Sequence, residues 1–273
     1  MVERYALSRD TLLVRGPDRK TWLDGLLTNK VTDVTAGSAG YGLLLTKQGK
    51  IVTDVFLADN GDELYVGVAP GHGDTVRQLL DRYLVMEDAE LEEPESKPSW
   101  CLAPRGASST ASPLAAGDLT LGGLTAELAV LTESQALPDA AELLAAHGLG
   151  VFGVDFGERD NPHEASLDRV AVSWSKGCYL GQEVVCMQDM RGKVKRRLVA
   201  LDGSAALLGD AAAPAEVVLA DGTVAGQVTS VHQRAEGARL LASISSSALD
   251  SQQGLAVRGE PLSVAFGVAP KMS

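Results

Sequence analysis

Residues Ser175–Gln188 read SKGCYLGQEVVCMQ and hold the densest group of chemically functional side chains in the chain. Lys176 offers a cation, Gln182 an amide that both donates and accepts hydrogen bonds, and Glu183 a carboxylate. This set suits a planar heterocycle with an acidic tail, because an amide and a carboxylate can bind ring edges while the cation meets the tail. A turn between strands with solvated polar side chains is the alternative interpretation.

Two glycines, Gly177 and Gly181, separate these polar side chains. Glycine permits positive φ and lets a ligand approach the backbone closely. Tyr179 lies between the glycines and is the aromatic residue best placed to contact a ligand. Cys178 is either a redox-active thiol helped by Lys176 or a small apolar residue that fills a gap. No neighbouring His, Asp or second Cys completes a nucleophilic constellation, so triad chemistry is not expected.

The octapeptide KGCYLGQE, from Lys176 to Glu183, resembles the signature of the YgfZ family of folate-binding proteins. The wider family includes the T-protein of glycine cleavage and the mitochondrial iron–sulfur assembly factor related to YgfZ. Further segments resemble the family in the same order: Gly16–Val31 (GPDRKTWLDGLLTNKV), Leu43–Leu57 (LLLTKQGKIVTDVFL), Asp189–Leu201 (DMRGKVKRRLVAL) and Ala220–Val231 (ADGTVAGQVTSV). The resemblance therefore extends over nearly the whole chain.

The resemblance implies an α+β fold with two α+β lobes plus a C-terminal small β-barrel around a central folate channel. Residues 1–192 would form the GcvT-like folate-binding region, with lobes of roughly 1–96 and 97–192. Residues 193–273 would form the C-terminal β-barrel domain.

Hydrophobic periodicity predicts helices at residues 17–27, 75–84 and 138–147. Strands are expected at 41–46, 51–58, 64–68, 100–103, 128–131, 198–201, 216–220, 224–231, 240–244 and 262–266. Residues 87–99 and 104–118 are predicted as loops from their Pro, Gly, Ser and acidic content. Trp22 and Trp174 are expected in the core.

The function that the resemblance implies is a tetrahydrofolate-binding accessory protein. It would support iron–sulfur cluster protein assembly or repair, with a downstream effect on tRNA modification. Its partners would be folate and iron–sulfur client enzymes, without a membrane and without direct contact to nucleic acid. The residues expected to bind folate are Asn29, Asp54, Lys176, Gly177, Tyr179, Gly181, Gln182, Glu183, Arg191 and Arg197. For Asn29, a role as a turn residue is the alternative.

An aminomethyltransferase of the T-protein type is a second hypothesis. The T-protein usually carries paired aspartates in its first hairpin, where this chain has Thr53 and Asp54. Asp54 would have to assist catalysis alone, so the chain is expected to lack turnover, although the question stays open. The family's Arg-x-Glu-x-Gly segment is also replaced here, by His147–Gly150, which removes one expected pterin contact.

The segment 191–197, RGKVKRR, is a basic patch in a chain whose net charge is −12. It could bind the glutamate tail of a polyglutamylated folate or RNA phosphates, or it could be a solvated linker. An RNA-associated factor is therefore a third hypothesis. The acidic net charge and the lack of interleaved aromatic residues weigh against it.

The cysteine and histidine content and the N-terminal sequence limit which cofactors and which cellular compartment are expected. The chain has three cysteines, Cys101, Cys178 and Cys186, and four histidines, without the close ligand spacing of a zinc or iron–sulfur site. No metal is therefore expected to be held by the protein itself, and no disulfide framework is indicated. The N-terminal sequence MVERYALSRD does not resemble a signal peptide, and no long apolar run is present. A cytoplasmic protein is expected.

Overall fold

The computed structural model describes residues 4–105, 113–133, 135–192, 194–208, 214–251 and 253–266. Contacts divide the chain into two compact units, each built from two separate stretches. Unit 1 comprises Met1–Ala140 with Arg169–Val184, and unit 2 comprises Ala141–Asp168 with Val185–Ser273. The lobe boundaries expected near residues 96 and 192 remain a prediction.

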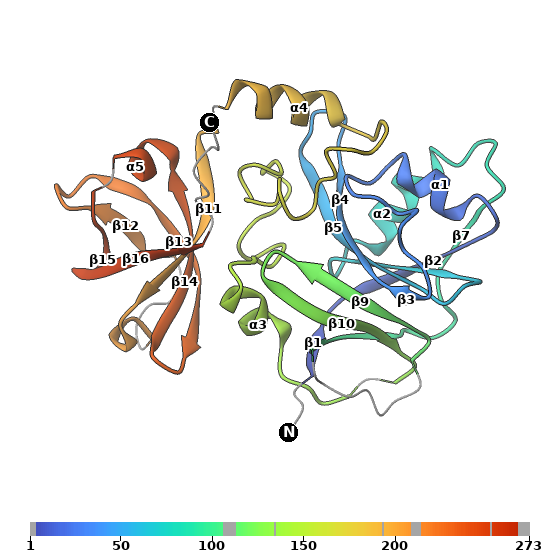
Figure 1. The fold of residues 1–273 in the computed structure, drawn as a ribbon, viewed down its shortest axis with the longest axis horizontal. Helices are drawn as coiled ribbons and strands as arrows, with labels where there is room; N and C mark the ends of the chain where they lie inside the picture. Colours follow the sequence, from blue (N-terminus) through green and yellow to red (C-terminus); the bar gives the residue numbers. More distant parts are fainter. Residues whose placement is uncertain are drawn as a thin grey trace. The chain divides into compact units, whose positions relative to one another are not determined.

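Unit 1 contains an antiparallel five-stranded sheet (Figure 1). Its strand order is β4 (Gly40–Leu45), β5 (Ile51–Asp59), β6 (Leu64–Val68), β2 (Asp10–Arg15) and β7 (Glu90–Glu92). The predicted meander of β4, β5 and β6 is confirmed within a residue or two of its expected bounds. The loop predicted for 87–99 was wrong at β7, a short acidic edge strand that pairs with β2.

Two helices pack on one face of this sheet. They are α1 (Arg19–Asp24) and α2 (Gly73–Asp81), and their buried side chains share one apolar core with β2, β5 and β6. Trp22 is buried in that core, and its indole nitrogen donates a hydrogen bond to the Tyr83 carbonyl at 2.9 Å. Both helices are shorter than predicted, because the chain leaves α1 at Gly25 and α2 at Arg82. The core position of Trp22 is confirmed.

A second five-stranded sheet completes unit 1. Its order is β1 (Tyr5–Leu7), β8 (Ser99–Pro104), β10 (Leu124–Leu131), β9 (Ala115–Leu121) and β3 (Gly37–Ser38). Trp100 of β8 packs over Gly67 of β6, where a Cβ atom would lie 2.9 Å from the indole ring. The Trp100 indole also donates to Thr11 Oγ1 at 2.9 Å. These contacts join the two sheets of unit 1.

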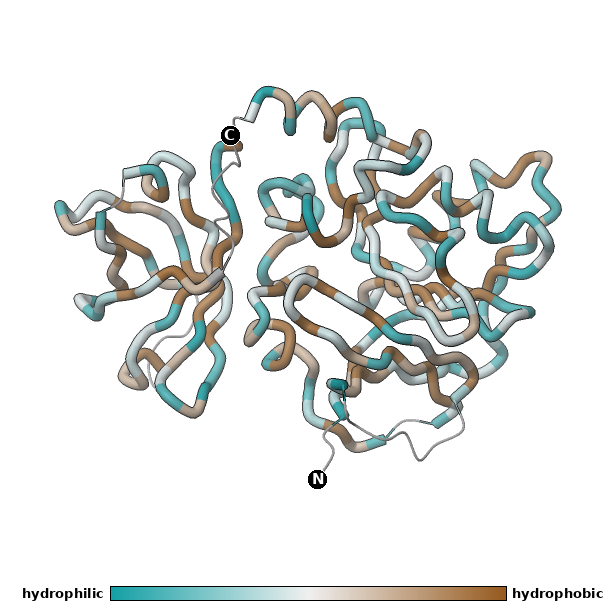
Figure 2. The backbone as a smooth tube through the Cα atoms, in the orientation of Figure 1, coloured by the Kyte–Doolittle hydropathy of each residue, from teal (hydrophilic) through white to brown (hydrophobic). Residues whose placement is uncertain are grey.

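Unit 2 contains a closed six-stranded barrel, which confirms the expected C-terminal β-barrel. Around the barrel the strands are β11 (Arg196–Gly203), β14 (Gly237–Ser245), β13 (Val224–Arg234), β12 (Glu216–Leu219), β15 (Leu255–Val257) and β16 (Glu260–Phe266). A short 3-10 helix (Ala205–Leu208) and α5 (Ser246–Asp250) lie between strands. Figure 2 shows hydrophobic stretches along the barrel strands, with hydrophilic residues at the turns.

Helix α3 (Ala140–Ala146) is held to the barrel by a buried arginine. Arg239 of β14 donates from Nη1 to the carbonyl oxygens of Ala145 and Ala146 at 3.0 and 3.1 Å. Its Nε donates to Asp202 at 2.8 Å. A guanidinium therefore caps carbonyl groups at the C-terminal end of α3, where a positive charge is favourable.

Helix α4 (Gln182–Arg191) was not expected. It begins with the last two residues of KGCYLGQE and ends at Arg191, the first residue of the basic segment. The boundary between the two units falls inside this helix. Trp174, expected in the core, is 47% exposed. In the described part of the chain, no helix has the length and apolar character needed to span a membrane.

Candidate functional site

The KGCYLGQE segment (residues 176–183) packs against the turn between β4 and β5 in unit 1. Gly181 has φ of +81°, and a Cβ atom there would lie 2.5 Å from the Thr46 carbonyl oxygen. Gly49, in the same turn, has φ of +71°, and its Cβ would lie 2.9 Å from the Val184 side chain. These glycines therefore allow two backbones to approach each other. Gly177 faces open space instead.

Lys176 holds the segment to the end of α1. Its ammonium group donates to the carbonyl oxygens of Asp24 (2.5 Å), Leu27 (2.9 Å) and Asn29 (2.9 Å). The Asp24 carboxylate lies 3.2 Å away, and the Lys176 side chain is 1% exposed. Burial lowers the pKa of Lys176, and Asp24 opposes that effect. The ammonium group is thus committed to the protein, and its predicted contact with a folate carboxylate remains untested.

Asn29 and Thr28 connect three segments that are distant in sequence. The Asn29 amide donates to the Tyr41 carbonyl oxygen at 2.8 Å and accepts from the Lys30 amide at 2.9 Å. Thr28 is fully buried, and its hydroxyl donates to the Ala171 carbonyl oxygen at 2.5 Å. The structure therefore places Asn29 in the turn role that the sequence offered as an alternative, directly beside Lys176.

Asp54 lies on β5 and forms a buried ion pair. The Arg9 guanidinium binds both carboxylate oxygens of Asp54, at 2.5 and 3.0 Å. The two side chains are 4% and 2% exposed, and Arg9 stacks on Phe56 with 4.5 Å to the ring centroid. The Tyr41 hydroxyl donates to Asp54 at 3.4 Å, and burial, with help from Asp54, holds the pKa of Tyr41 well above its usual value. Asp54 is therefore not a free acid or base.

Thr53, which occupies the other position of the expected aspartate pair, is also buried. Its hydroxyl donates to the Asp54 carbonyl oxygen at 3.0 Å and accepts from the Ala69 amide at 3.1 Å. The Thr53 side chain thus links β5 to the residue that follows β6 by a hydrogen bond.

The remaining residues of the segment differ in exposure. Tyr179 is buried, and its ring centroid lies 5.8 Å from the Lys176 ammonium. Cys178 is exposed, Gln182 is half-buried, and Glu183 is exposed in the first turn of α4. A carboxylate is favourable in that turn because the helix dipole is positive there. The segment therefore presents Cys178 and Glu183 to solvent while Tyr179 anchors it.

Cavities in unit 1 border the predicted residue Asn29 and Arg9, the partner of Asp54. Asn29 and Tyr41 line a cavity of about 220 Å³ that also borders β9 and Val170. Arg9 lines two others, of about 290 and 310 Å³, together with Lys97 and Pro98. Each is at or below the lower end of small-molecule pockets, so each could accept a ring system rather than a whole large cofactor.

Arg191 and Arg197 lie in unit 2. Arg191 is exposed in the last turn of α4. Arg197 donates to Asp168 at 3.2 Å and to the His163 carbonyl oxygen at 3.4 Å, and Arg196 pairs with Asp160 at 2.7 Å. Lys193 lies outside the described residues. Two arginines of the basic segment are therefore already paired with carboxylates.

Sequence reasoning missed Arg9 and Asp24, the partners that fix Asp54 and Lys176. Arg9 lies 45 residues from Asp54 in the sequence, and Asp24 lies 152 residues from Lys176. Neither local periodicity nor the octapeptide carries a signal for such long-range pairs. The tertiary fold brings these pairs together.

Comparisons with known proteins agree with this fold. Residues 8–110 match the family model described as the GCVT N-terminal domain. The mitochondrial iron–sulfur cluster assembly factor IBA57 homolog of Chaetomium globosum is 27% identical over 257 residues, covering 77% of this chain and 59% of the relative. Human mitochondrial IBA57 is 26% identical over 230 residues, covering 70% and 63%. The tRNA-modifying protein YgfZ of Serratia proteamaculans is 36% identical over 93 residues, covering 34% and 28%.

The matches thus span less than two thirds of the length of each of these relatives. Among solved structures, the glycine cleavage system aminomethyltransferase T from Bartonella henselae is similar with a TM-score of 0.71 at 15% identity, covering 97% of this chain and 85% of that one. At this identity the similarity shows the fold alone.

The expectation of a cytoplasmic protein was wrong. The relatives from Chaetomium globosum, Neurospora crassa and human are named mitochondrial proteins, which points to mitochondria instead. The expectation rested on the lack of a secretory signal pattern and of a disulfide framework in the sequence. Neither property separates the cytoplasm from the mitochondrial interior.

Proposed function

We propose that this chain, which belongs to the GcvT-like family that includes YgfZ and IBA57, is a tetrahydrofolate-binding accessory protein for the assembly or repair of iron–sulfur proteins. Three of the relatives are named iron–sulfur cluster assembly factors, which supports a role in this process. The observation that carries the proposal is the fixed position of KGCYLGQE, tied by Lys176 to Asn29 and by Gly181 to the β4–β5 turn.

In the proposed site, Lys176 and Gly181 would hold the KGCYLGQE segment in place, and Lys176 would not itself be a free cation. These contacts fix the start of α4, where the Gln182 amide and the exposed Glu183 carboxylate can bind donors and acceptors on a heterocycle edge. Asn29 and Tyr41 border a cavity of about 220 Å³ that can take a planar ring. These features support folate binding on chemical grounds.

Binding without turnover is favoured over aminomethyl transfer. A general acid must reach the reacting group and exchange its proton there. Asp54 is 2% exposed and binds Arg9 through both oxygens, so its carboxylate is buried and already occupied by an internal partner. A transferase assay with tetrahydrofolate and an aminomethyl-lipoyl carrier protein is expected to show no turnover above background. Turnover that is lost in Asp54→Asn would overturn this assignment.

Folate binding is tested by titrating the full chain with tetrahydrofolate while intrinsic tryptophan fluorescence is followed. Trp174 is partly exposed and lies two residues from Lys176, so binding at the segment should change its emission. We expect a saturable change at sub-millimolar ligand, absent in Trp174→Phe. Gln182→Ala should weaken binding about tenfold, since one lost amide contact corresponds to about 1.4 kcal/mol.

The matched control is Gln227→Ala on the exposed side of β13, which should bind like the wild type. Absence of a saturable signal in fluorescence and in calorimetry would refute folate binding. Equal affinities for Gln182→Ala and Gln227→Ala would remove the segment from the binding site.

The role in iron–sulfur protein assembly is tested separately in cells that lack their own relative of this chain. Expression of the wild type should restore the activity of an iron–sulfur enzyme, measured against an enzyme without a cluster. Cys178→Ser separates two roles of the exposed thiol: full restoration excludes a thiol reaction, whereas loss with normal folate binding supports one.

A further inference from the structure

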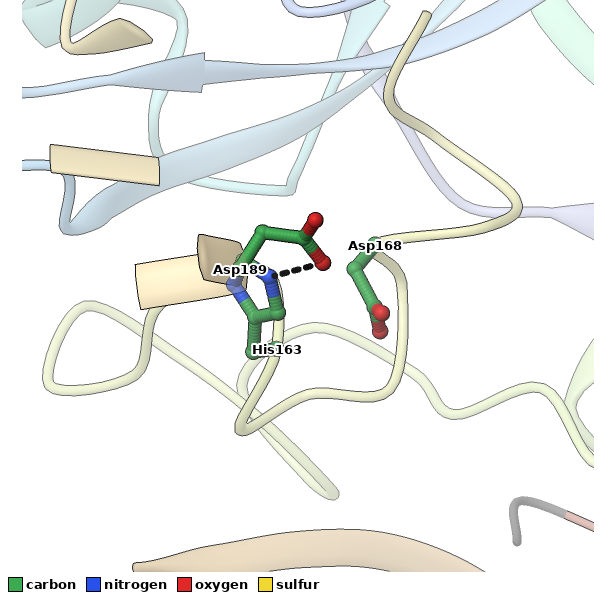
Figure 3. Close-up of side chains that lie close together, drawn as sticks. All are labelled: His163, Asp168 and Asp189. Carbon is green, nitrogen blue, oxygen red and sulfur yellow. Dashed lines mark ion pairs between the residues drawn. The ribbon is translucent and has the colours of Figure 1, made fainter. Parts of the chain in front are cut away.

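Three potential metal ligands, two from one loop and one from α4, converge in unit 2 (Figure 3). They are His163, Asp168 and Asp189, and their ligand atoms all lie within 4.8 Å of one another. The His163 Nε2 atom lies 3.5 Å from the nearer oxygen of Asp189. Sequence analysis predicted no metal, because the histidine and the second aspartate are 26 positions apart and no ligand spacing is visible.

A tight loop sets the positions of His163 and Asp168. The Asn161 side-chain oxygen accepts from the backbone amides of His163 and Glu164, both at 3.0 Å. Ser166 has a φ of 56°, which is uncommon outside glycine, and its hydroxyl donates to the Leu198 carbonyl oxygen at 2.7 Å. The loop thereby reverses within a few residues and brings both side chains to one place.

Asp189 reaches the same place from α4. Val185, one turn earlier on the helix, is buried and fixes its orientation. Asp189 lies in the last turn of α4, where the carbonyl groups make the local potential negative. That potential favours a cation beside the carboxylate.

We propose that His163, Asp168 and Asp189 bind a divalent metal ion of the first transition row. Metal–ligand bonds of about 2.0–2.2 Å place neighbouring ligand atoms about 3–3.5 Å apart and opposite ones about 4.4 Å apart. The observed separations require only small side-chain rotations to meet these values. An imidazole nitrogen with two carboxylate oxygens suits Mn²⁺, Fe²⁺ or Zn²⁺ and is poor for Mg²⁺, which prefers oxygen ligands and water.

The surroundings supply what a bound cation needs. Arg197 donates to one oxygen of Asp168 at 3.2 Å, which fixes the orientation of the carboxylate. Asp189 is 56% exposed while His163 is 2% exposed, so the site opens to solvent on the aspartate side. Solvent would complete the coordination, as in metal sites with three protein ligands.

An ion pair between protonated His163 and Asp189 is the competing explanation of the same geometry. It needs no metal, and it would disappear as the imidazole loses its proton. A metal ion behaves in the opposite way, because it binds the neutral imidazole and competes with protons. Direct metal binding at neutral pH therefore separates the two.

The experiment uses Mn²⁺, which binds oxygen and imidazole ligands and has little affinity for the thiols of this chain. The full chain is stripped with a chelator, desalted and titrated, and free Mn²⁺ is measured by its solution EPR signal. We expect one Mn²⁺ per chain, with an affinity that falls at least about tenfold in Asp189→Asn. Asp250→Asn removes an exposed carboxylate elsewhere in unit 2 and should bind like the wild type.

Pulsed EPR on the bound Mn²⁺ should show coupling to a directly coordinated imidazole nitrogen, and His163→Asn should abolish it. Because His163 is buried, that variant is accepted only if its circular dichroism matches the wild type; otherwise the nitrogen coupling in the wild type and the Asp189→Asn titration decide. No saturable binding at millimolar Mn²⁺, no nitrogen coupling, or equal affinity in Asp189→Asn and Asp250→Asn would each overturn the proposal. This inference does not depend on folate binding.

Discussion

Lys176 illustrates how a charged residue of a predicted binding segment can be engaged by partners within the protein. A lysine in a ligand-binding motif predicts a free cation, but here three carbonyl oxygens and a carboxylate surround its ammonium group. The residue thereby fixes the chain between the end of α1 and Asn29. Its effect on binding would be exerted through the shape of this turn.

Replacement of Lys176 by Met is expected to lower the free energy of unfolding by about 2–4 kcal/mol. The methylene groups still pack, but three carbonyl groups and Asp24 lose their common donor. Urea denaturation measures the change. Lys30→Met, at a lysine whose side chain is 40% exposed and 3.9 Å from Asp33, should change stability by less than about 1 kcal/mol. Equal effects of the two substitutions would contradict the structural role of Lys176.

The Arg9–Asp54 pair makes a second prediction at this scale. Asp54→Leu and Arg9→Met should each destabilise the protein by about 3–5 kcal/mol, because each leaves the charge of the partner buried and unpaired. The double variant Arg9→Met, Asp54→Leu should recover most of that loss, since it removes both charges. The cycle is measured by urea denaturation. A double variant as unstable as the sum of the two single ones would show that the residues are not coupled.

At the scale of elements, the KGCYLGQE segment and the β4–β5 turn approach each other closely at Gly181. Gly181→Ala should destabilise the protein by about 2 kcal/mol or more, because the new methyl group meets the Thr46 carbonyl and the backbone has positive φ. Gly177→Ala is the matched control, since a Cβ there meets open space. Thermal unfolding followed by circular dichroism compares the two. A wild-type melting temperature for Gly181→Ala would contradict the packing described.

The β6 strand carries a pH-dependent contribution through Tyr65. Burial, together with a hydrogen bond to Glu63 at 2.9 Å, raises the pKa of Tyr65 to about 12. The unfolded chain loses this proton near pH 10, whereas the folded chain keeps it. The stability is therefore complete below about pH 10 and falls as the pH rises toward the folded value.

Urea denaturation at pH values between about 9 and 11 should show this fall, and Tyr65→Phe should make it shallower. Some slope will remain, because the pKa of Tyr41 is raised as well. An unchanged slope in Tyr65→Phe would mean that Tyr65 titrates normally.

The sequence predicted some elements well and others not at all, for physical reasons. Strands β5 and β6 are rich in Val and other large apolar residues, which indicate buried strands. Strand β9 reads AAGDLTL, where Ala and Gly hide an alternating burial pattern. Helix α4 buries Val185 and has almost no amphipathic pattern. Its sequence therefore gave no helical signal, and the polar residues around its start favoured a turn instead.

The candidate site was predictable only in part for a related reason. The octapeptide identified the segment, and Asn29 and Asp54 do lie in the same unit as Lys176. The roles of these residues depend on partners such as Arg9, Asp24 and Ala171, which the fold brings from remote positions. A sequence pattern contains residue types, whereas the commitment of a charge to an internal partner depends on tertiary structure.

At the scale of the whole molecule, electrostatics argues against binding of tRNA. The net charge is −12, and within the basic segment Arg196 and Arg197 are paired with Asp160 and Asp168. We expect no retention of tRNA at physiological salt in a filter-binding assay, because few positive charges remain to release counterions. Binding at physiological salt that is lost in Lys195→Ala, Arg196→Ala would establish the RNA-associated function.

The order in which the two units use the chain has a consequence for synthesis. Along the chain, Ala141–Asp168, which belongs to unit 2, comes before Arg169–Val184, the last stretch of unit 1. On the ribosome, a nascent chain that ends before residue 169 therefore lacks the Ala171 carbonyl that Thr28 needs and the ammonium group that Lys176 supplies. Unit 1 therefore stays incomplete during synthesis until those residues emerge.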